Sequence, residues 1–173
     1  EIAAIGVAVG ANYAGVPTLT ITSGPGMALK TEFQGLAAMT ETPIVIVDVQ
    51  RGGPSTGLPT RTAQGDLSFT NFMGHGDSQS IILLPGGVDE CFEFGWRAFD
   101  VAEQLQTPVF VLSDLDMGMN QWMSKPFQYP NTPMQRGKVL WEKDLEELKG
   151  NWARYLDKDG DGTPEHYGVP YQW

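Results

Sequence analysis

The chain has 173 residues, 41% of them hydrophobic, which is enough for one globular domain with a buried core. Its formal net charge of −10, with no basic stripe, argues against a nucleic-acid-binding face. A single cysteine, Cys91, excludes an internal disulfide framework and a four-cysteine zinc or iron–sulfur site within the chain. We therefore expect a cytoplasmic protein.

The chain begins with the apolar run EIAAIGVAVGA. This run is too short to span a bilayer, which takes ~20 residues, and it has no basic leader, so we expect a core helix over 1–14 and no membrane segment. Small residues at helical spacing would let another backbone approach closely; they are Ala3, Gly6, Gly10 and Ala14. A sequence that starts within a helix is expected of a fragment cut from a longer polypeptide.

Strands and helices then alternate. Short apolar or β-branched runs predict buried strands at 16–22, 43–49, 80–85 and 107–114. Helical patterns between them predict helices over 27–41, about 62–73 and 88–106. Strands joined by helices of this length imply crossover connections and a parallel sheet, so the predicted fold class is α/β. Ligands are expected outside the carboxyl ends of such strands, near which we place the loops at 23–26, 50–56 and 74–77.

The sequence changes character after residue 114. Much of the following stretch is rich in Pro, Asn, Gln and Met, and one surface helix is predicted over 142–156. We expect residues 1–114 to form most of a domain whose N-terminal part is absent. Residues 115–173 are expected to be an irregular segment with one helix, leading toward a missing C-terminal domain.

Two motifs have weak chemical interpretations. His75 beside Asp77 could act as a general base, although such a histidine is more often a structural hydrogen-bonding residue. The segment DKDGDG places Asp157, Asp159 and Asp161 at the first liganding positions of a calcium loop, but its twelfth position is Gly168 instead of Glu. We favour a turn rich in Asp and Gly and assign no metal ligand; a calcium-binding structural protein is the competing hypothesis.

The segment SGPG follows the first predicted strand. It lacks the Lys-Ser/Thr of a P-loop, and the sequence after it lacks the third glycine of the dinucleotide fingerprint. Gly24 and Gly26 could be simple turn residues. Alternatively, these glycines clear space for a flat ligand or let backbone N–H groups reach one.

The segment VQRGGPSTGLPT follows the second apolar strand. Arg51 carries five donors in a fixed fork that matches a carboxylate, and Thr56 and Thr60 add hydroxyl groups. Such a stiff loop suits a small anionic substrate. The alternative is that Arg51 pairs with a local acid such as Asp48 or Asp66.

Glu1 precedes ten residues that are all apolar or glycine. A carboxylate at a helix N-terminus is favoured by the helix dipole, so Glu1 could be a cap or a first-turn acid. If it is buried instead, its pKa would rise and it could share a proton with a ligand nitrogen.

The run TSGPGMALKTEFQGLAAMTETPIVIVDVQRGGPSTGLPTRTAQGDL resembles the α subunits of 2-oxoacid:ferredoxin oxidoreductases, and within that family the 2-oxoglutarate enzymes. The likeness extends through PVFVLSDLDMGMNQWMSKPF to DGDGTPEH and so covers essentially the whole chain. It implies the pyrimidine-binding module of a thiamine diphosphate enzyme, with helices on both faces of its parallel sheet.

The resemblance also implies cofactors and partners. The family's β subunit carries the diphosphate-binding module, the Mg²⁺ and, in most members, an iron–sulfur cluster, so thiamine diphosphate is shared between subunits. The implied reaction is oxidative decarboxylation of a 2-oxo acid with coenzyme A, giving acyl-CoA, CO₂ and two reduced ferredoxins. We expect the first helix to pack at the β-subunit interface, and the isolated chain to have no turnover.

The resemblance assigns roles to individual residues. Glu1 aligns with the catalytic glutamate that hydrogen-bonds the aminopyrimidine N1′ and favours the imino tautomer of the ring. Gly24 and Gly26 are assigned to cofactor binding. Arg51 aligns with the arginine that holds the substrate carboxylate, and Thr56 and Thr60 match threonines near the substrate pocket.

Two alternatives stay open. The chain could be a non-catalytic module that shares the thiamine-enzyme fold and only assembles with partners. It could also belong to an enzyme specific for pyruvate or branched-chain 2-oxo acids, because these share the carboxylate that Arg51 would hold.

Overall fold

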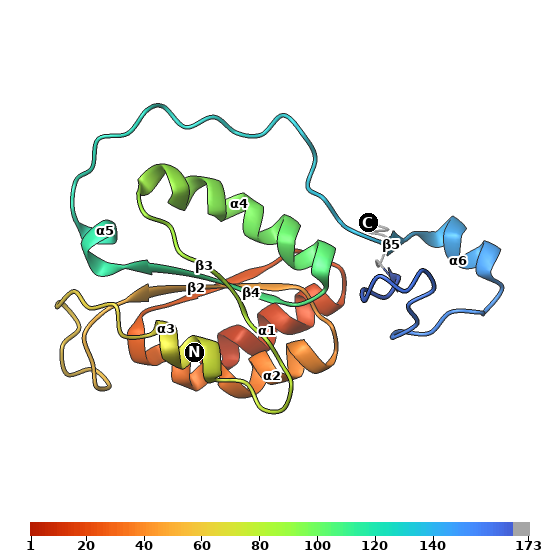
Figure 1. Ribbon diagram of the computed structural model, residues 1–173, viewed down its shortest axis with the longest axis horizontal. Helices are drawn as coiled ribbons and strands as arrows, with labels where there is room; N and C mark the ends of the chain where they lie inside the picture. Colours follow the sequence, from red (N-terminus) through yellow and green to blue (C-terminus); the bar gives the residue numbers. More distant parts are fainter. Residues whose placement is uncertain (168–173) are drawn as a thin grey trace.

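A computed structural model describes residues 1–167 of the chain, and its main feature is a four-stranded parallel sheet (Figure 1). The strands lie in the order β1-β2-β4-β3, all parallel to their neighbours. Their bounds are β1 Leu19–Thr22, β2 Ile44–Gln50, β3 Ile81–Leu83 and β4 Pro108–Asp114. The predicted α/β class and parallel sheet are confirmed, with each strand shorter than or close to its expected length.

Helices cover both faces of this sheet (Figure 1). On one face lie α1 Ile2–Tyr13, the 3-10 helix η1 Gly24–Lys30, α2 Thr31–Met39 and α3 Leu67–Phe72. On the other face lies α4 Val88–Leu105. Strand β2 shows the reason, because Ile44 and Ile46 join the core with α1 and α2, while Val45 and Val47 pack in the core with α4. A strand buried on both faces has a continuous apolar sequence instead of an alternating one.

The helix predicted over 27–41 is divided in the structure. The first part is the 3-10 helix η1, which begins inside the SGPG turn with Pro25 near its start, and α2 begins only at Thr31. Proline is well placed in a first helical turn, because its missing N–H has no partner to lose there. The buried positions still follow one stripe at spacings of three and four across both helices: Met27, Lys30, Gln34 and Ala37.

The residues after β4 form a long strap that arches past α4 before it reaches β5 and α6 (Figure 1). They contain α5 Leu115–Met119, β5 Val139–Leu140, α6 Glu142–Leu148 and β6 His166–Tyr167, with β5 and β6 paired in parallel. The structure therefore has two short helices here, where the sequence predicted one. Arg154 anchors the strap by donating to the backbone oxygens of Thr40 and Glu41 at the end of α2, at 2.7–3.1 Å.

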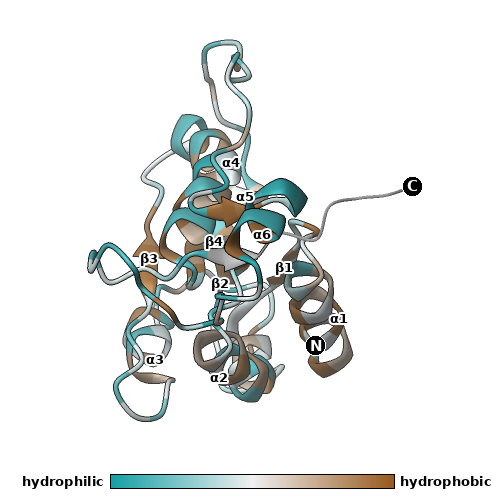
Figure 2. Cartoon of the chain, turned by 90° about the vertical axis from the view of Figure 1, so that its right-hand side faces the viewer, coloured by the Kyte–Doolittle hydropathy of each residue, from teal (hydrophilic) through white to brown (hydrophobic). Residues whose placement is uncertain are grey.

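Helix α1 leaves apolar side chains at the surface. Ile2 and Val7 are 56% and 72% exposed, and Ile21 of the neighbouring edge strand β1 is 60% exposed. Figure 2 shows the hydrophobic colouring along α1. A side chain at Gly6 would meet the ring of Phe33 in α2, but one at Gly10 would meet nothing within 4 Å, so α2 uses only part of the small-residue stripe. None of the helices in the described part of the chain is long and apolar enough to cross a membrane.

Candidate functional site

The two glycine-rich loops lie side by side at the carboxyl edge of the sheet, because they follow the adjacent parallel strands β1 and β2. The Ser23 hydroxyl donates to the backbone oxygen of Val49 at 2.8 Å. A Cβ at Gly24 would lie 2.9 Å from Cγ of Arg51, and Gly24 has a φ of +52°, which favours glycine. The backbone of the SGPG turn therefore packs directly against Arg51.

Arg51 donates from Nη1 to the backbone oxygens of Gly52 at 3.0 Å and of Ser55 at 3.3 Å. It forms no ion pair within 4 Å among residues 1–167, so neither Asp48 nor Asp66 makes a direct salt bridge with it. Most of its donors are therefore available to a ligand. Thr56 and Thr60 lie on the exposed outer part of the same loop.

The base of this loop is fixed by three hydrogen bonds. Gly52 N–H donates to the backbone oxygen of Arg61 at 2.6 Å. The Gln64 side chain donates to the Asp114 carboxylate at 2.6 Å, and the backbone N–H of Asp66 donates to Gln50 at 3.1 Å. These contacts attach the loop to the ends of β2 and β4, so Arg51 projects from a closed loop instead of a free one.

Glu1 lies at the start of α1, but its side chain does not cap the helix. Its Oε2 is 2.8 Å from Nζ of Lys30; the Lys30 side chain is fully buried, whereas that of Glu1 is 33% exposed. Its Oε1 faces the SGPG turn, 3.2 Å from the position that a Cβ at Gly26 would take. That Cβ would also lie 2.2 Å from the Thr22 hydroxyl, so the turn needs glycine at this point.

The pKa of Glu1 is not raised, and this carboxyl is only partly buried. Burial does raise the pKa of this carboxyl, but the hydrogen bond and charge of Lys30, together with the Thr22 hydroxyl, outweigh burial and lower the pKa below its usual value. Glu1 is therefore ionised near neutral pH, and its outward oxygen is a hydrogen-bond acceptor.

Lys30 is the site residue that sequence reasoning missed. Its Nζ donates to Oγ1 of Thr20 at 2.8 Å as well as pairing with Glu1. The signal was present in the sequence, because Lys30 stands between Met27 and Gln34 at the spacing of the buried stripe. A lysine at a buried position needs an acidic partner, and this requirement could have directed the search to Glu1.

Two neighbouring acidic residues, Asp48 and Asp66, lie close to Arg51. Asp48 of β2 is completely buried, and neither of its oxygens makes a well-formed hydrogen bond to the described residues. Burial raises the pKa of Asp48 to about 8; the Asp66 carboxyl adds to this rise, while the Gly24 N–H and Arg51 oppose it. The Asp48–Asp66 pair therefore holds a proton near neutral pH, which leaves less negative charge next to Arg51.

His75 lies away from this site. The loop at 74–77 leads into β3 and borders α2 and Thr107, which precedes β4. It is therefore at the amino edge of the sheet, and the expectation that it lies near the carboxyl edge is wrong. An open cavity of about 600 Å³ lies there, lined in part by Glu32, His75 and Asp77.

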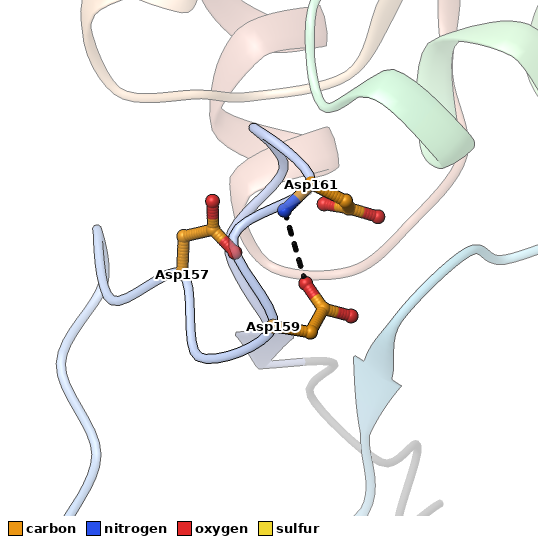
Figure 3. A group of neighbouring side chains, drawn as sticks. All are labelled: Asp157, Asp159 and Asp161. Carbon is orange, nitrogen blue, oxygen red and sulfur yellow. Dashed lines mark hydrogen bonds between the residues drawn. The ribbon is translucent and has the colours of Figure 1, made fainter.

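The DKDGDG segment forms a separate acidic loop, shown in Figure 3. Carboxylate oxygens of Asp157, Asp159 and Asp161 lie within 4.8 Å of one another, which would suit a cation. However, Nζ of Lys138 is 2.7 Å from Asp159 and 2.7 Å from Asp161, and it donates to the backbone oxygen of Thr163 at 2.9 Å. The lysine thus supplies positive charge to the loop. The twelfth position of the calcium pattern lies outside the described residues.

Four of the predicted site residues are therefore brought together: Glu1, Gly24, Gly26 and Arg51. An ionised carboxylate and a guanidinium-bearing side chain lie against the same glycine turn at the edge of the sheet, Glu1 at Gly26 and Arg51 at Gly24. This arrangement can accept a hydrogen bond from a flat nitrogen-containing ring and donate to a small carboxylate.

Comparison with known proteins identifies similar chains. Residues 1–137 match the family described as pyruvate flavodoxin/ferredoxin oxidoreductase, thiamine diphosphate-binding. A 2-oxoglutarate synthase subunit KorA from Methanothermobacter marburgensis is 53% identical over 118 residues, covering 68% of this chain and 32% of the relative. A 2-oxoglutarate oxidoreductase subunit KorA from Mycobacterium tuberculosis is 45% identical over 131 residues, covering 76% of this chain and 20% of the relative.

A solved structure is also similar. It is a 2-oxoglutarate:ferredoxin oxidoreductase from Magnetococcus marinus with 2-oxoglutarate, coenzyme A and succinyl-CoA bound. Its TM-score is 0.82 at 38% identity, over 99% of this chain and 28% of the solved one. The chain spans about a third of the length of the KorA relative from Methanothermobacter and less of the others.

Proposed function

Since the chain belongs to the thiamine diphosphate-binding family of pyruvate flavodoxin/ferredoxin oxidoreductases, we propose that it is part of the α subunit of a 2-oxoacid:ferredoxin oxidoreductase. The proposed substrate is 2-oxoglutarate, because two of the relatives carry that substrate in their names and the solved enzyme binds it. The proposed reaction is oxidative decarboxylation to an acyl-CoA and CO₂, with reduction of ferredoxin.

The residues at the carboxyl edge fit the aminopyrimidine ring of thiamine diphosphate. Glu1 has one oxygen occupied by Lys30 and the other directed to the Gly26 side, where it would accept a hydrogen bond from ring nitrogen N1′ in the imino tautomer, in which N1′ carries a proton. The turn at Gly24 and Gly26 carries no side chain that would fill this space. Thiamine diphosphate, when bound, supplies the nucleophilic carbon and the electron sink that decarboxylation requires.

Arg51 would hold the substrate carboxylate. Its guanidinium lacks an ion-pair partner among residues 1–167, and the proton held by the neighbouring Asp48–Asp66 pair reduces the negative charge beside it, so its positive charge is only partly offset locally. Holding the carboxylate would orient the adjacent carbonyl carbon toward the nucleophilic carbon that the cofactor's thiazolium ring supplies, while the aminopyrimidine ring is held at Glu1. Thr56 and Thr60 would add hydroxyl contacts from the exposed part of the loop.

A partner subunit would complete the site. In the described part of the chain, one group of three acidic side chains could hold a metal ion. It is in the 157–161 loop, which belongs to the strap and is not at the carboxyl edge. Following the family resemblance, we place Mg²⁺, the diphosphate and the iron–sulfur cluster on the β subunit. The exposed apolar side of α1 is the surface we assign to that subunit. We expect the enzyme in the cytoplasm, with coenzyme A and ferredoxin as its other partners.

The observation that carries this proposal is the placement of Glu1 and Arg51 against one glycine turn, at Gly26 and Gly24 respectively. It is tested on the assembled enzyme, supplied with thiamine diphosphate and coenzyme A, by following viologen reduction across a panel of 2-oxo acids. We expect 2-oxoglutarate to be used best, and Arg51→Ala to lower kcat/KM about 10- to 150-fold, because a hydrogen bond to a charged group contributes about 1.5–3 kcal/mol.

Arg61→Ala is the matched control, because the side chain of this arginine, at the C-terminal end of the same loop, is exposed. If Arg51→Ala matches wild type while the enzyme is active, Arg51 is structural and the substrate site is misplaced. If a folded complex loaded with cofactor and cluster fails to reduce viologen with every 2-oxo acid of the panel, the chain is a non-catalytic assembly module instead.

A further inference from the structure

The Lys30–Glu1 pair has an unusual distribution of burial. The lysine is fully buried, while its carboxylate partner is one-third exposed at the start of α1. A buried ammonium group costs free energy unless it is paired and hydrogen-bonded, and here the two partners at 2.8 Å are Glu1 Oε2 and Thr20 Oγ1. Of these two partners, Glu1 also faces the SGPG turn, where the proposed cofactor site lies.

Packing alone does not explain a lysine at this position. The stripe of η1 and α2 that faces the sheet contains Met27 before Lys30, and the uncharged side chains of Gln34 and Ala37 after it. An apolar side chain of similar volume would continue this stripe, and replacing buried ion pairs by well-packed apolar groups is often neutral or stabilising. The charge of Lys30 therefore points to a role outside packing.

The geometry indicates that role, because Lys30 occupies only one of the two carboxylate oxygens. The other oxygen, Oε1, is the one that faces Gly26. A partly exposed glutamate without a fixed partner would sample several rotamers, and a ligand would have to select one of them at a cost in affinity. A partner held rigidly in the core removes that cost.

We propose that Lys30 is a positioning residue that fixes Oε2 of Glu1 and so presents Oε1, ionised, to the ring nitrogen of the bound cofactor. This inference rests on the proposed function, in which Glu1 contacts that ring. The side chains that act on the Glu1 carboxyl are those of Lys30 and Thr22. Lys30 has the larger influence of the two, so its removal should change the Glu1 carboxyl more than removal of the Thr22 hydroxyl would.

A double-mutant cycle tests this inference, with the dissociation constant of thiamine diphosphate for the assembled enzyme as the readout. Glu1→Gln, Lys30→Met and the double variant are titrated by fluorescence between about pH 6 and pH 8. We expect Lys30→Met to weaken binding about tenfold or more when Glu1 is present, and by less than about twofold in the Glu1→Gln background, because coupled residues are not additive.

The pH dependence separates positioning from a general loss of structure. When Lys30 is removed, its hydrogen bond and charge no longer lower the pKa of Glu1, whereas burial still raises it. A larger fraction of this carboxyl is therefore protonated as the pH falls. The loss of affinity in Lys30→Met should therefore be larger at the acidic end of the range. Lys125→Met is the matched control, since this lysine is exposed, and it should bind the cofactor as wild type does.

A milder pair of variants keeps the inference testable if Lys30→Met does not fold. Thr20→Val removes the second anchor of the Lys30 ammonium group, while Thr20→Ser keeps the hydroxyl. We expect Thr20→Val to weaken cofactor binding several-fold, only when Glu1 is present, and Thr20→Ser to bind as wild type does.

The outcomes distinguish the two proposals. Equal losses from Lys30→Met with and without Glu1 would assign Lys30 a structural role and overturn the inference. Unchanged binding in Lys30→Met and Thr20→Val, with weak binding in Glu1→Gln, would overturn the inference and leave the proposed function standing. Unchanged binding in Glu1→Gln would overturn both.

Discussion

Two lysines in this molecule bridge oxygen ligands at nearly the same distances but in different surroundings. Lys30 pairs with Glu1 at 2.8 Å and is fully buried. Lys138 pairs with Asp159 and Asp161 at 2.7 Å, is itself 25% exposed, and has partners that are more than half exposed. By distance alone, the Lys138 cluster would be judged at least as strong.

Burial reverses that ranking. Exposed ion pairs contribute little because water and salt screen them, and holding long side chains in one geometry costs entropy. At the buried site, removal of one partner leaves a charge that water reaches poorly. The carboxyl edge of the sheet therefore depends on its charges for both structure and chemistry, whereas the DKDGDG loop uses them mainly to shape a turn.

The largest expected effect comes from Glu1→Ala. It leaves the Lys30 ammonium group buried with only Thr20 as partner, and we expect a loss of about 3 kcal/mol in the free energy of unfolding. This is the low end of the range for broken buried pairs, because the exposed part of Glu1 gives water some access. Urea unfolding measures it, and Glu1→Gln, which keeps an oxygen acceptor, should lose less. A loss no larger than that of an exposed pair would remove the contrast between the two lysines.

The buried acid Asp48 gives the next effect, and it depends on pH. The folded state raises the pKa of Asp48 to about 8, against ~3.9 in an unfolded chain. A carboxyl of this kind contributes stability while it is protonated in the folded state, and this contribution is lost as the pH rises from about 4 to about 8.

Asp48→Asn removes this dependence, because the amide does not ionise. We expect Asp48→Asn to be more stable than wild type by about 1–3 kcal/mol near pH 8, and nearly equal to it near pH 4. Denaturant midpoints across this pH range measure the difference. A difference between the two proteins that stays constant with pH would mean that Asp48 is ionised in the folded state.

The glycine turn tests how closely Glu1 and Thr22 approach. A Cβ in Gly26→Ala would lie 2.2 Å from the Thr22 hydroxyl, so we expect a loss of about 1–2 kcal/mol from overpacking, together with weaker cofactor binding in the assembled enzyme. Gly10→Ala is the matched control, because nothing lies within 4 Å of that position. It should gain about 0.5–1 kcal/mol from helix propensity. Equal effects at both positions would contradict the close packing of the turn.

The smallest effect is expected from Lys138→Met. Its melting temperature should fall less than that of Glu1→Ala, and the difference from wild type should disappear near 1 M salt, where the screening length is about 3 Å. Thermal unfolding at low and high salt measures this. A loss that persists at high salt would show that the exposed cluster contributes as a buried pair does.

The sequence predicted the sheet well because its strands are apolar on both faces. The run PIVIVDV, for example, has no alternation and is flanked by turn residues, so β2 and its place in a parallel sheet followed directly. The short α3 and the early end of α6 were less predictable, since weakly periodic polar segments carry little information about where a helix ends.

The site was predicted in part. Glu1, Gly24, Gly26 and Arg51 were singled out, but their arrangement around one turn depends on β1 and β2 being neighbours, which no local pattern specifies. Lys30 was missed although its place in the buried stripe was visible in the sequence, and Asp48 was considered only as an ion-pair partner of Arg51, because its raised pKa comes from burial produced by the fold. His75 was placed at the wrong edge for a related reason: the connection through α3 carries the chain back across the sheet before β3 begins.

The most direct test of the account is a structure of the assembled enzyme with thiamine diphosphate and a 2-oxo acid bound. We expect ring nitrogen N1′ within hydrogen-bond distance of Glu1 Oε1, with Lys30 still on Oε2, and the substrate carboxylate on Arg51. A ring nitrogen held by another residue, with the carboxylate of Glu1 facing solvent, would contradict the account.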